Sequence, residues 1–321
     1  EEEYFYQLAV LLGEVSGRYF GVLQIQDAIE SNNSEIEALS NQLDQVESLY
    51  DRQLSQITDL YQVQASLAAA EAQRLQLNAE LALNQESLRS ISGLDVGPLF
   101  KLSDSANVPE LEFSQQFYVD QALEKNHQVL ANKFALRAAE EGISQRKGAF
   151  MPQVSFIAQR QDSDVGFNNL PINRTDTTYV GLNVQIPIYS GGRNRAGLSE
   201  AHSVRNIAES ELRASELRVR ELVRSAFLQA QASGAQTSAA RILVDSTRLA
   251  AEAMQQGFNL GTVTSVDVLN ALRDQFRAER ELQRIRYDHI RHLLLLKRET
   301  GTLTADDLLE VGSLLVPPRA E

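Results

Sequence analysis

The sequence predicts a mainly α-helical protein with a small β part: long α-helical hairpins that pack like coiled coils, joined to a single β-hairpin. Three observations predict this class. Apolar residues recur every three or four positions through most of the 321 residues, which is typical of packed helices. One segment near the middle alternates apolar and polar residues, which is typical of strands. Two long stretches of the chain also resemble each other, which indicates an internal duplication.

The first helical hairpin is predicted from a helix at 3–52, a turn at 53–58 and a second helix at 59–92. The second helix carries a seam that steps by three and four residues without a break, and seven of its nine members are apolar: Leu60, Val63, Leu67, Ala70, Arg74, Leu77, Leu81, Asn84 and Leu88. Such a seam predicts side-by-side helix packing. An irregular connector follows at 93–113, and then a helix at 114–149.

The β part is predicted as a strand at 152–164, a polar loop at 165–176 and a second strand at 177–189. In the second strand, alternate residues from Thr178 to Ile188 form one largely apolar face, while Tyr179, Gly181, Asn183 and Gln185 form a polar one. A strand of about ten residues with one apolar face suits the wall of a membrane β-barrel. We therefore expect a transmembrane β-hairpin whose lipid-facing residues are Val180, Leu182, Val184 and Ile186.

The second helical hairpin comprises predicted helices at 194–257 and 265–299, a turn at 258–264 and a mixed tail at 300–321. Residues 50–93 align with residues 258–301 at a constant offset of 208 without a gap, so that Asp59 meets Asp267 and Gly93 meets Gly301. The helix at 194–257 would be about 95 Å long. A helix of that length needs neighbours along its whole length, which predicts an oligomer.

Composition excludes several functions. A net charge of −13 argues against nucleic-acid binding, and the absence of cysteine excludes disulfides. No run of 18 apolar residues is found, so no transmembrane helix is expected. No catalytic motif and no cofactor signature is recognised, so no enzyme is predicted. His289 and His292 lack a third ligand, so no metal is expected, and the arginine stripe at 273, 277, 280 and 284 is expected to pair with nearby carboxylates.

Several motifs, taken in order, resemble the TolC family of Gram-negative outer-membrane efflux and secretion ducts. In the second half they are Ile186–Gly192 (IPIYSGG), Gly261–Ala271 (GTVTSVDVLNA), Arg286-Tyr287-Asp288 and Leu296–Leu303 (LKRETGTL). In the first half they are Arg18-Tyr19-Phe20 and Ile57–Ala65. The resemblance implies a homotrimer in which each protomer adds strands to a shared, trimeric β-barrel and long helices to a periplasmic tunnel. The family's first strand pair would precede residue 1, so an N-terminally shortened chain is expected.

The resemblance also implies a division of the chain and a function. The expected segments are 1–92, the first repeat; 93–113, an equatorial connector; 114–149, a tunnel or equatorial helix; 150–189, the barrel strand pair; 190–300, the second repeat; and 301–321, an equatorial tail. The implied function is a passive exit duct in the outer membrane, with its helical part in the periplasm. It would be opened by a periplasmic adaptor protein and an inner-membrane pump of the ABC, RND or MFS type.

The implied cargo stays open between small molecules, in efflux, and proteins, in type I secretion. The expected binding partners also include the lipid of the outer membrane, and nucleic acid is not among them. Two other classes of protein compete with this hypothesis. A soluble coiled-coil scaffold would explain the heptads but leave the alternating hairpin unexplained. A periplasmic adaptor protein would require many short strands, which the sequence does not predict.

The site residues implied by the resemblance lie at the two turns. The tip gate comprises Thr58, Asp59, Phe258, Val263, Asp267 and Asn270; the adaptor contact comprises Gln53, Leu54, Leu260, Gly261 and Thr262. Phe258, Val263 and Asn270 stand where the family has tyrosine, arginine and aspartate, so the gate is expected to rest more on packing. Helix capping by the two aspartates, a plain turn glycine at 261 and ordinary packing of the strand aromatics (Phe150, Phe156, Phe167, Tyr179 and Tyr189) remain alternatives.

Overall fold

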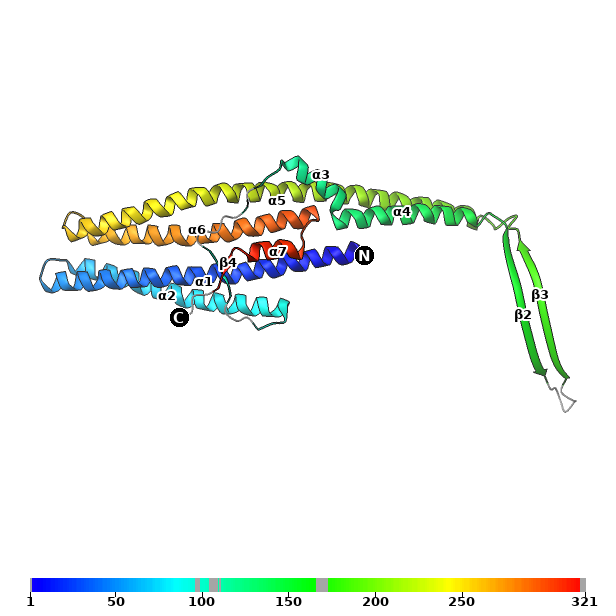
Figure 1. The fold of residues 1–321 in the computed structure, drawn as a ribbon, viewed down its shortest axis with the longest axis horizontal. Helices are drawn as coiled ribbons and strands as arrows, with labels where there is room; N and C mark the ends of the chain where they lie inside the picture. The colour runs from blue at the N-terminus through cyan, green and yellow to red at the C-terminus, as the bar shows by residue number, and fades with distance from the viewer. Residues whose placement is uncertain (1, 96–98, 104–108, 110, 166–172, 318–321) are drawn as a thin grey trace. The chain divides into compact units, whose positions relative to one another are not determined.

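The computed structural model describes residues 2–95, 99–103, 109, 111–165 and 173–317. The chain separates into two compact units. One unit combines Glu1–Gln128 with Leu217–Glu321, and the other is Val129–Glu216. Helices dominate both units, and the strand pair belongs to the second (Figure 1). The predicted class, mainly α with a small β part, is confirmed.

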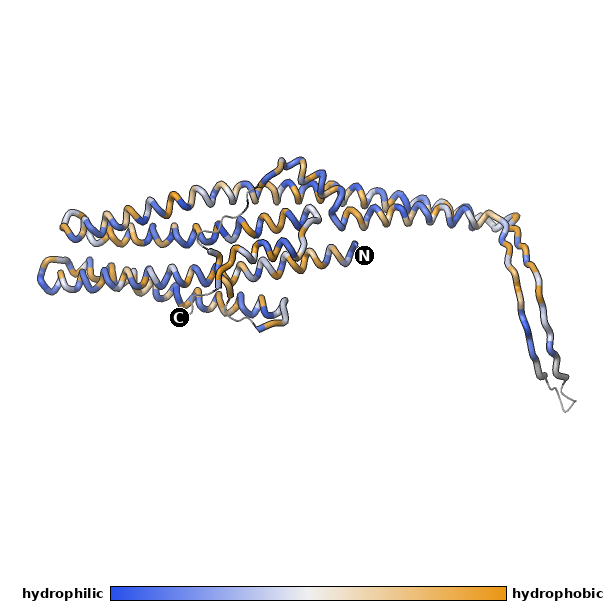
Figure 2. The backbone as a smooth tube through the Cα atoms, in the orientation of Figure 1, coloured by the Kyte–Doolittle hydropathy of each residue, from blue (hydrophilic) through white to orange (hydrophobic). Residues whose placement is uncertain are grey.

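The first unit is built on helical hairpins. Helix α1 (Glu2–Asp51) turns back into α2 (Ile57–Ser92). Helix α5 (Arg193–Asn259), which belongs to this unit from Leu217 onward, turns back into α6 (Ser265–Thr300). Helix α1 packs against both α2 and α6, so that it lies between them (Figure 1). Apolar and polar residues alternate along all four helices, as Figure 2 shows, because each helix buries only one stripe.

Two apolar clusters hold the first unit together. One joins α1, α2 and α6 near the turns and contains the buried residues Leu39, Val46, Val63, Ala70 and Leu269. The other joins α1 and α6 to α7 (Ala305–Gly312) and to the short strand β1 (Lys101–Leu102), and contains the buried residues Phe20, Leu23, Leu102, Tyr287, Ile290, Leu294 and Leu303. Strand β1 pairs with β4 (Leu315–Val316) in antiparallel fashion, which ties the connector to the tail.

The internal duplication is confirmed to the residue. The offset of 208 carries the end of α1, Asp51, onto the end of α5, Asn259, and the start of α2 onto the start of α6. The helices α2 and α6 both end at a left-handed glycine, Gly93 with φ 68° and Gly301 with φ 73°. These glycines serve as C-caps because residues with a Cβ avoid positive φ.

The single helix predicted for 114–149 is wrong. Two helices replace it, α3 (Gln115–Lys125) and α4 (His127–Gly148), with a break at Asn126. The Asn126 backbone is extended, with ψ 122°, and its side chain donates from Nδ2 to the Glu299 carbonyl at 2.8 Å. The Asn126 Oδ1 accepts from the Gln128 amide at 3.0 Å. One asparagine therefore ends α3 and begins α4.

The second unit contains the β-hairpin. Strands β2 (Gln153–Val165) and β3 (Asn173–Gln185) pair in antiparallel fashion over their whole length, from Gln153 opposite Gln185 to Val165 opposite Asn173. Strand β3 thus begins and ends earlier than predicted. Ile186, expected as a lipid-facing strand residue, lies just beyond the strand end, where Pro187 offers no backbone N–H to a ladder. The middle of the predicted loop, with Phe167, lies outside the described residues.

The expectation that no helix crosses a membrane stays a prediction, because one helix is apolar enough by composition to do so. Helix α1 has an 18-residue window with a mean hydropathy of 1.2, so by length and composition this helix is apolar enough to cross a membrane. No other helix among the described residues qualifies. A core helix of a soluble protein passes the same test, so this observation alone is weak evidence for a membrane span.

Candidate functional site

The two interhelical turns share one backbone conformation. In the first turn the Gln53 amide donates to the Tyr50 carbonyl at 2.8 Å, and in the second the Gly261 amide donates to the Phe258 carbonyl at 2.9 Å. Both central residues are left-handed, with φ 62° at Gln53 and φ 72° at Gly261. The offset of 208 relates the two pairs. The absence of glycine from the first turn therefore does not change its shape, and Gln53 bears a strain that Gly261 avoids.

Each turn presents exposed apolar side chains. Leu54 is 72% exposed and Leu260 is 80% exposed, which is high for leucine. Gln53, Gly261 and Thr262 are also exposed, although the Thr262 hydroxyl donates to the Gly257 carbonyl at 3.0 Å. The residues expected to contact an adaptor are therefore all at the surface of this chain.

Helix α6 begins with a complete capping box. Thr264 is the N-cap; its Oγ1 accepts from the Asp267 amide at 3.3 Å, and an Asp267 carboxylate oxygen accepts from the Thr264 amide at 3.0 Å and from its hydroxyl at 2.6 Å. These hydrogen bonds from Thr264 lower the pKa of the Asp267 carboxyl. Asp267 therefore caps its helix and is also a fully ionised carboxylate at the surface.

The first turn is capped less completely. Gln56 is the N-cap of α2 and its side chain makes no capping hydrogen bond. The Asp59 carboxylate instead accepts from the Ser55 hydroxyl at 3.2 Å, and the exposed Thr58 hydroxyl donates to the Gln56 side chain at 3.4 Å. Asp59 and Asp267, which occupy corresponding positions of the two repeats, therefore have different hydrogen-bond partners.

Phe258 packs inside the chain. It is partly buried against the cluster of α1, α2 and α6 residues around Leu39 and Val46. Val263 is also partly buried, and its methyl groups lie 3.1 Å and 3.3 Å from the point that a Cβ at Gly257 would occupy. Gly257 thus lets the turn close against Val263.

A polar link near the turns joins the two repeats, and sequence reasoning missed it. The Gln255 amide of α5 donates to Gln45 Oε1 of α1 at 3.1 Å, and Gln45 Nε2 donates to Asn259 Oδ1 at 2.6 Å. All three side chains are uncharged amides at positions that the apolar seam does not single out. No local signal could have identified the link, because its partners lie more than 200 positions apart in the sequence.

The acidic face of α6 extends further than expected. Asp267, Asn270 and Asp274 are all exposed and lie at spacings of three and four, which places them on one face of the helix. Asp274 was missed, although its i+7 spacing from Asp267 could have revealed it. Asn270 Oδ1 accepts from Arg273 at 3.4 Å.

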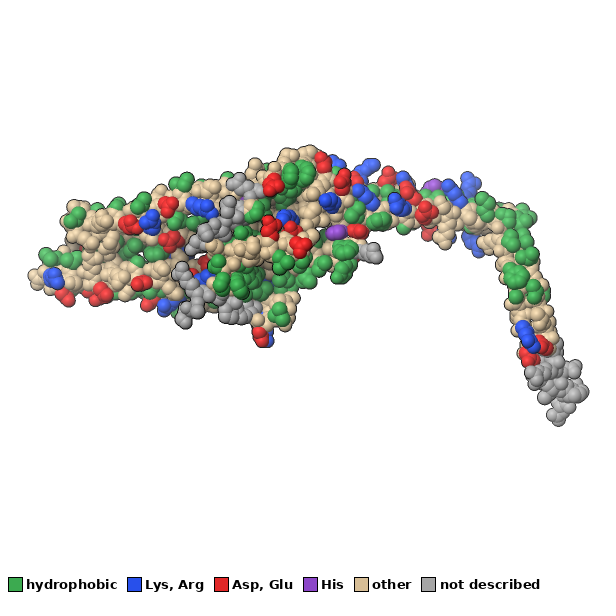
Figure 3. All heavy atoms as spheres, in the orientation of Figure 1, with side chains coloured by type: hydrophobic (Ala, Val, Ile, Leu, Met, Phe, Trp, Pro, Cys, Tyr) green, Lys and Arg blue, Asp and Glu red, His purple; other side chains and the backbone are tan. Residues whose placement is uncertain are grey.

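Over the half of the hairpin next to Gln153 and Gln185, the strand pair has one apolar and one polar face, and further along the apolar face continues into the charged residues Arg160 and Asp176. Cross-strand neighbours on the apolar face are Val154 with Val184, Phe156 with Leu182 and Ala158 with Val180. The valines, Phe156 and Leu182 are all exposed in the isolated chain. Figure 3 shows hydrophobic side chains on the half of the hairpin near the helices and charged ones further along, where Arg160 pairs with Asp176 at 2.6 Å.

The polar face carries one aromatic contact. The Tyr179 hydroxyl lies 2.5 Å from the point that a Cβ at Gly181 would occupy, so the tyrosine side chain covers the glycine. Phe150 and Tyr189 are exposed beyond the strand ends. Tyr179 and Phe156 are exposed within the strands. These rings are left exposed by the part of the chain that the structure describes, so lipid and other protomers are available partners for them.

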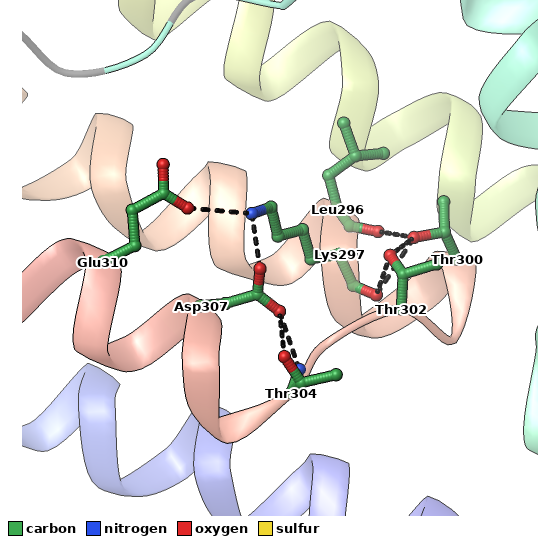
Figure 4. Close-up of polar contacts among 7 residues, drawn as sticks. All are labelled: Leu296, Lys297, Thr300, Thr302, Thr304, Asp307 and Glu310. Carbon is green, nitrogen blue, oxygen red and sulfur yellow. Dashed lines mark hydrogen bonds and ion pairs between the residues drawn. The ribbon is translucent and has the colours of Figure 1, made fainter.

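The motif at 296–303 is structural. The Lys297 ammonium lies 2.6 Å from Asp307 and 3.8 Å from Glu310, which fastens α7 to the end of α6 (Figure 4). Asp307 also accepts from the Thr304 amide at 2.7 Å, as the N3 residue of a second capping box. A Cβ at Gly301 would lie 2.4 Å from the Lys125 carbonyl oxygen, so only glycine allows α3 to pack this closely.

Of the four arginines expected to pair with carboxylates, Arg280 and Arg284 do so, whereas Arg273 and Arg277 have no carboxylate partner among the described residues. His289 is buried, and its Nδ1 lies 3.0 Å from the Ser233 hydroxyl. Arg280 pairs with Glu35 at 2.6 Å, and Arg284 pairs with Glu281 at 2.5 Å and Asp288 at 2.9 Å. Within the described ranges, no three His, Cys, Asp or Glu side chains are grouped so that they could hold a metal ion.

Comparisons with known proteins agree on one family. The profile of the outer membrane efflux protein family matches residues 118–302, more than half of the chain. Outer membrane protein TolC of Vibrio cholerae is 29% identical over 94% of this chain and 70% of its own length. The alkaline protease secretion protein AprF of Pseudomonas aeruginosa is 25% identical over 98% of this chain and 66% of its own length.

The solved structures agree on the fold. The outer-membrane channel OprN superimposes with a TM-score of 0.80 over 94% of this chain and 68% of its own, at 19% identity. The chain thus spans about two thirds of the length of these relatives. The expected resemblance and the expected outer-membrane location are both confirmed. The chain belongs to the outer membrane efflux protein family.

Proposed function

We propose that this chain forms, as a homotrimer, the outer-membrane exit duct of a tripartite efflux or type I secretion system. The observation that carries the proposal is the combination of a duplicated helical hairpin with a β-hairpin that has one apolar face. Exposed apolar residues on the strands and along α2 and α5, among them Leu75, Leu83, Leu217 and Ile242, need lipid or other protomers to cover them. A passive duct needs no catalytic residues, and the named relatives are channel and secretion proteins.

The turns are proposed as the docking points for a periplasmic adaptor, with an inner-membrane pump of the ABC, RND or MFS type behind it. Two observations support this. The turns share one backbone conformation, and each exposes a leucine beside a left-handed residue. Both turns would therefore offer an adaptor the same backbone shape, although the exposed leucine follows the left-handed residue in the first turn and precedes it in the second.

The gate is proposed to lie on the α6 face that carries Asp267, Asn270 and Asp274. Repeated by three protomers around an axis, these residues would place two rings of carboxylates beside the pore and favour cations. Closure would rest on the packing of Phe258 and Val263 and on the Gln45 link, with Thr58 and Asp59 in support.

The membrane part of the proposal is tested by charge placement on β3. Leu182→Asp and Val184→Asp put a carboxylate on the apolar face and should impair membrane assembly, by roughly 1–3 kcal/mol per site. Asn183→Asp is the matched control, since it adds the same charge between them on the opposite face. Membrane-extracted trimer would be quantified for each variant. Equal yields for all three variants would contradict the assignment of the apolar face to lipid.

The competing coiled-coil scaffold predicts a protein that is soluble without detergent, and the adaptor alternative predicts binding to a duct rather than formation of one. The exposed apolar face of the strand pair favours the duct over both. The cargo follows from the pump and adaptor in this proposal, so small molecules and proteins both remain within it.

A further inference from the structure

A cavity of about 200 Å³ lies between α1, α2 and α6, within the first unit. Its polar lining comes from all three helices: Asn32 and Glu35 of α1, Ser66 and Gln73 of α2, and Arg273 and Arg280 of α6. Neither the turns nor the strand pair contribute to it. A space of this size, with polar groups converging on it, can hold a small polar ligand.

Asn32 has an unmet hydrogen-bonding requirement at this cavity. Its side chain is 1% exposed, and neither Nδ2 nor Oδ1 has a hydrogen-bond partner in the part of the chain that the structure describes. A buried amide without partners costs about 1–3 kcal/mol. A water molecule or a ligand in the cavity would satisfy this amide.

The charges around the cavity do not cancel. Arg280 is neutralised by Glu35, whose carboxylate lies 2.6 Å from the guanidinium. Arg273 has only the 3.4 Å contact to Asn270, and no carboxylate pairs with it among the described residues. One positive charge and the two N–H groups of the Asn32 amide therefore remain available to the cavity.

We propose that this cavity binds a small monovalent anion, of the halide or short carboxylate class. Arg273 supplies the charge and Asn32 the buried N–H donors, and the single uncompensated positive charge of the lining matches a monovalent anion. Water would satisfy the Asn32 amide as well, so the choice of an anion over water rests on the net positive charge of the lining, in which the exposed Arg273 stands at the solvent side. The bound anion would join the first hairpin to the second, because its ligands lie on α1 and α6.

Bromide tests the site, because its anomalous scattering identifies it directly. Crystals of the full-length protein grown in sodium bromide should give an anomalous peak in the cavity near Asn32 and Arg273. Thermal unfolding in detergent should shift upward and saturate as bromide replaces gluconate at constant ionic strength. Arg273→Gln should weaken the apparent bromide affinity about tenfold or more, since it removes a charged hydrogen-bond donor. Arg277→Gln, an exposed neighbour on the same helix outside the cavity lining, should leave the affinity unchanged.

Asn32→Leu separates loss of binding from loss of folding. Leucine fills similar space without an unmet hydrogen bond, so the variant should fold at least as stably while its bromide response disappears. A cavity with no anomalous peak would overturn the proposal, and so would an equal bromide shift in Arg273→Gln. A peak without a saturable shift would mean binding at crystal concentration only and would also overturn it.

Discussion

Gly261→Ala should destabilise the protein although the added methyl group would meet no steric clash. No atom lies within 4 Å of the position that a Cβ would occupy there, so the cost is purely conformational. A residue with a Cβ at φ 72° loses roughly 1–2 kcal/mol of folding free energy to backbone strain. About 0.4–1 kcal/mol of this loss is offset, because alanine lowers the conformational entropy of the unfolded chain. The expected net loss is about 1 kcal/mol per protomer.

The matched control is Gly17→Ala. Gly17 also has open space around its Cβ position, but it lies inside α1 at helical φ, where alanine should stabilise by about 0.5–1 kcal/mol. Gln53→Gly gives the reciprocal test in the first turn, because it relieves the same strain at φ 62° and should be neutral or stabilising.

The assay is the midpoint of guanidinium unfolding of the detergent-solubilised protein, followed by circular dichroism. Opposite signs for Gly261→Ala and Gly17→Ala would support a left-handed residue as the shared feature of both turns. A stabilising Gly261→Ala, alike in sign to the control, would refute the reasoning, since it would mean that the second turn does not require positive φ.

Two further predictions concern the contacts that hold the first unit together. The Asp27 carboxyl accepts a hydrogen bond from the Tyr287 hydroxyl at 2.6 Å, and burial raises the pKa of Asp27. Asp27 therefore contributes to the free energy of unfolding below its ordinary pKa of 3.8, and this contribution is lost as the pH rises through the raised pKa of the folded state. Asp27→Asn keeps the acceptor and should flatten this dependence, measured as unfolding midpoints from about pH 4 to about pH 7; a wild-type-like pH slope in the variant would contradict the assignment. Gly301→Ala would place a Cβ 2.4 Å from the Lys125 carbonyl oxygen at φ 73°, so it should lower the midpoint by more than Gly261→Ala does, and an equal or smaller loss would show that α3 moves aside at little cost.

The duplication and its boundaries were predictable because they rest on local signals. Both copies carry a run of seam residues that ends at a glycine, Gly93 or Gly301, and these glycines are needed for the left-handed C-cap. The alternation from Thr178 onward predicted the strand and its faces for the same reason, since the side-chain period of a strand is two residues.

The features that sequence missed depend on distant partners. The break at Asn126 depends on a hydrogen bond from its side chain to the Glu299 carbonyl. The sequence around Asn126 contains no proline or glycine that would mark the end of a helix, since the first glycine after Gln115 is Gly142. Glutamine rarely adopts positive φ, so the residue type of Gln53 does not predict its left-handed backbone. Only its correspondence to Gly261 in the second copy indicates it. For Asp267, the sequence predicted both a helix cap and a gate carboxylate, which do not exclude each other. The structure shows the helix cap.

The most direct test of the account is single-channel conductance of the detergent-extracted trimer in planar bilayers. A duct with carboxylates at its tip predicts discrete, cation-selective steps, with selectivity reduced by Asp267→Asn and unchanged by Glu71→Gln, an exposed carboxylate on α2. Because the tip could be shut at rest, the measurement includes Phe258→Ala and Gln45→Ala, which remove the packing and the polar link expected to hold it closed. A folded trimer that conducts in none of these variants, or whose selectivity ignores Asp267, would contradict the proposed duct.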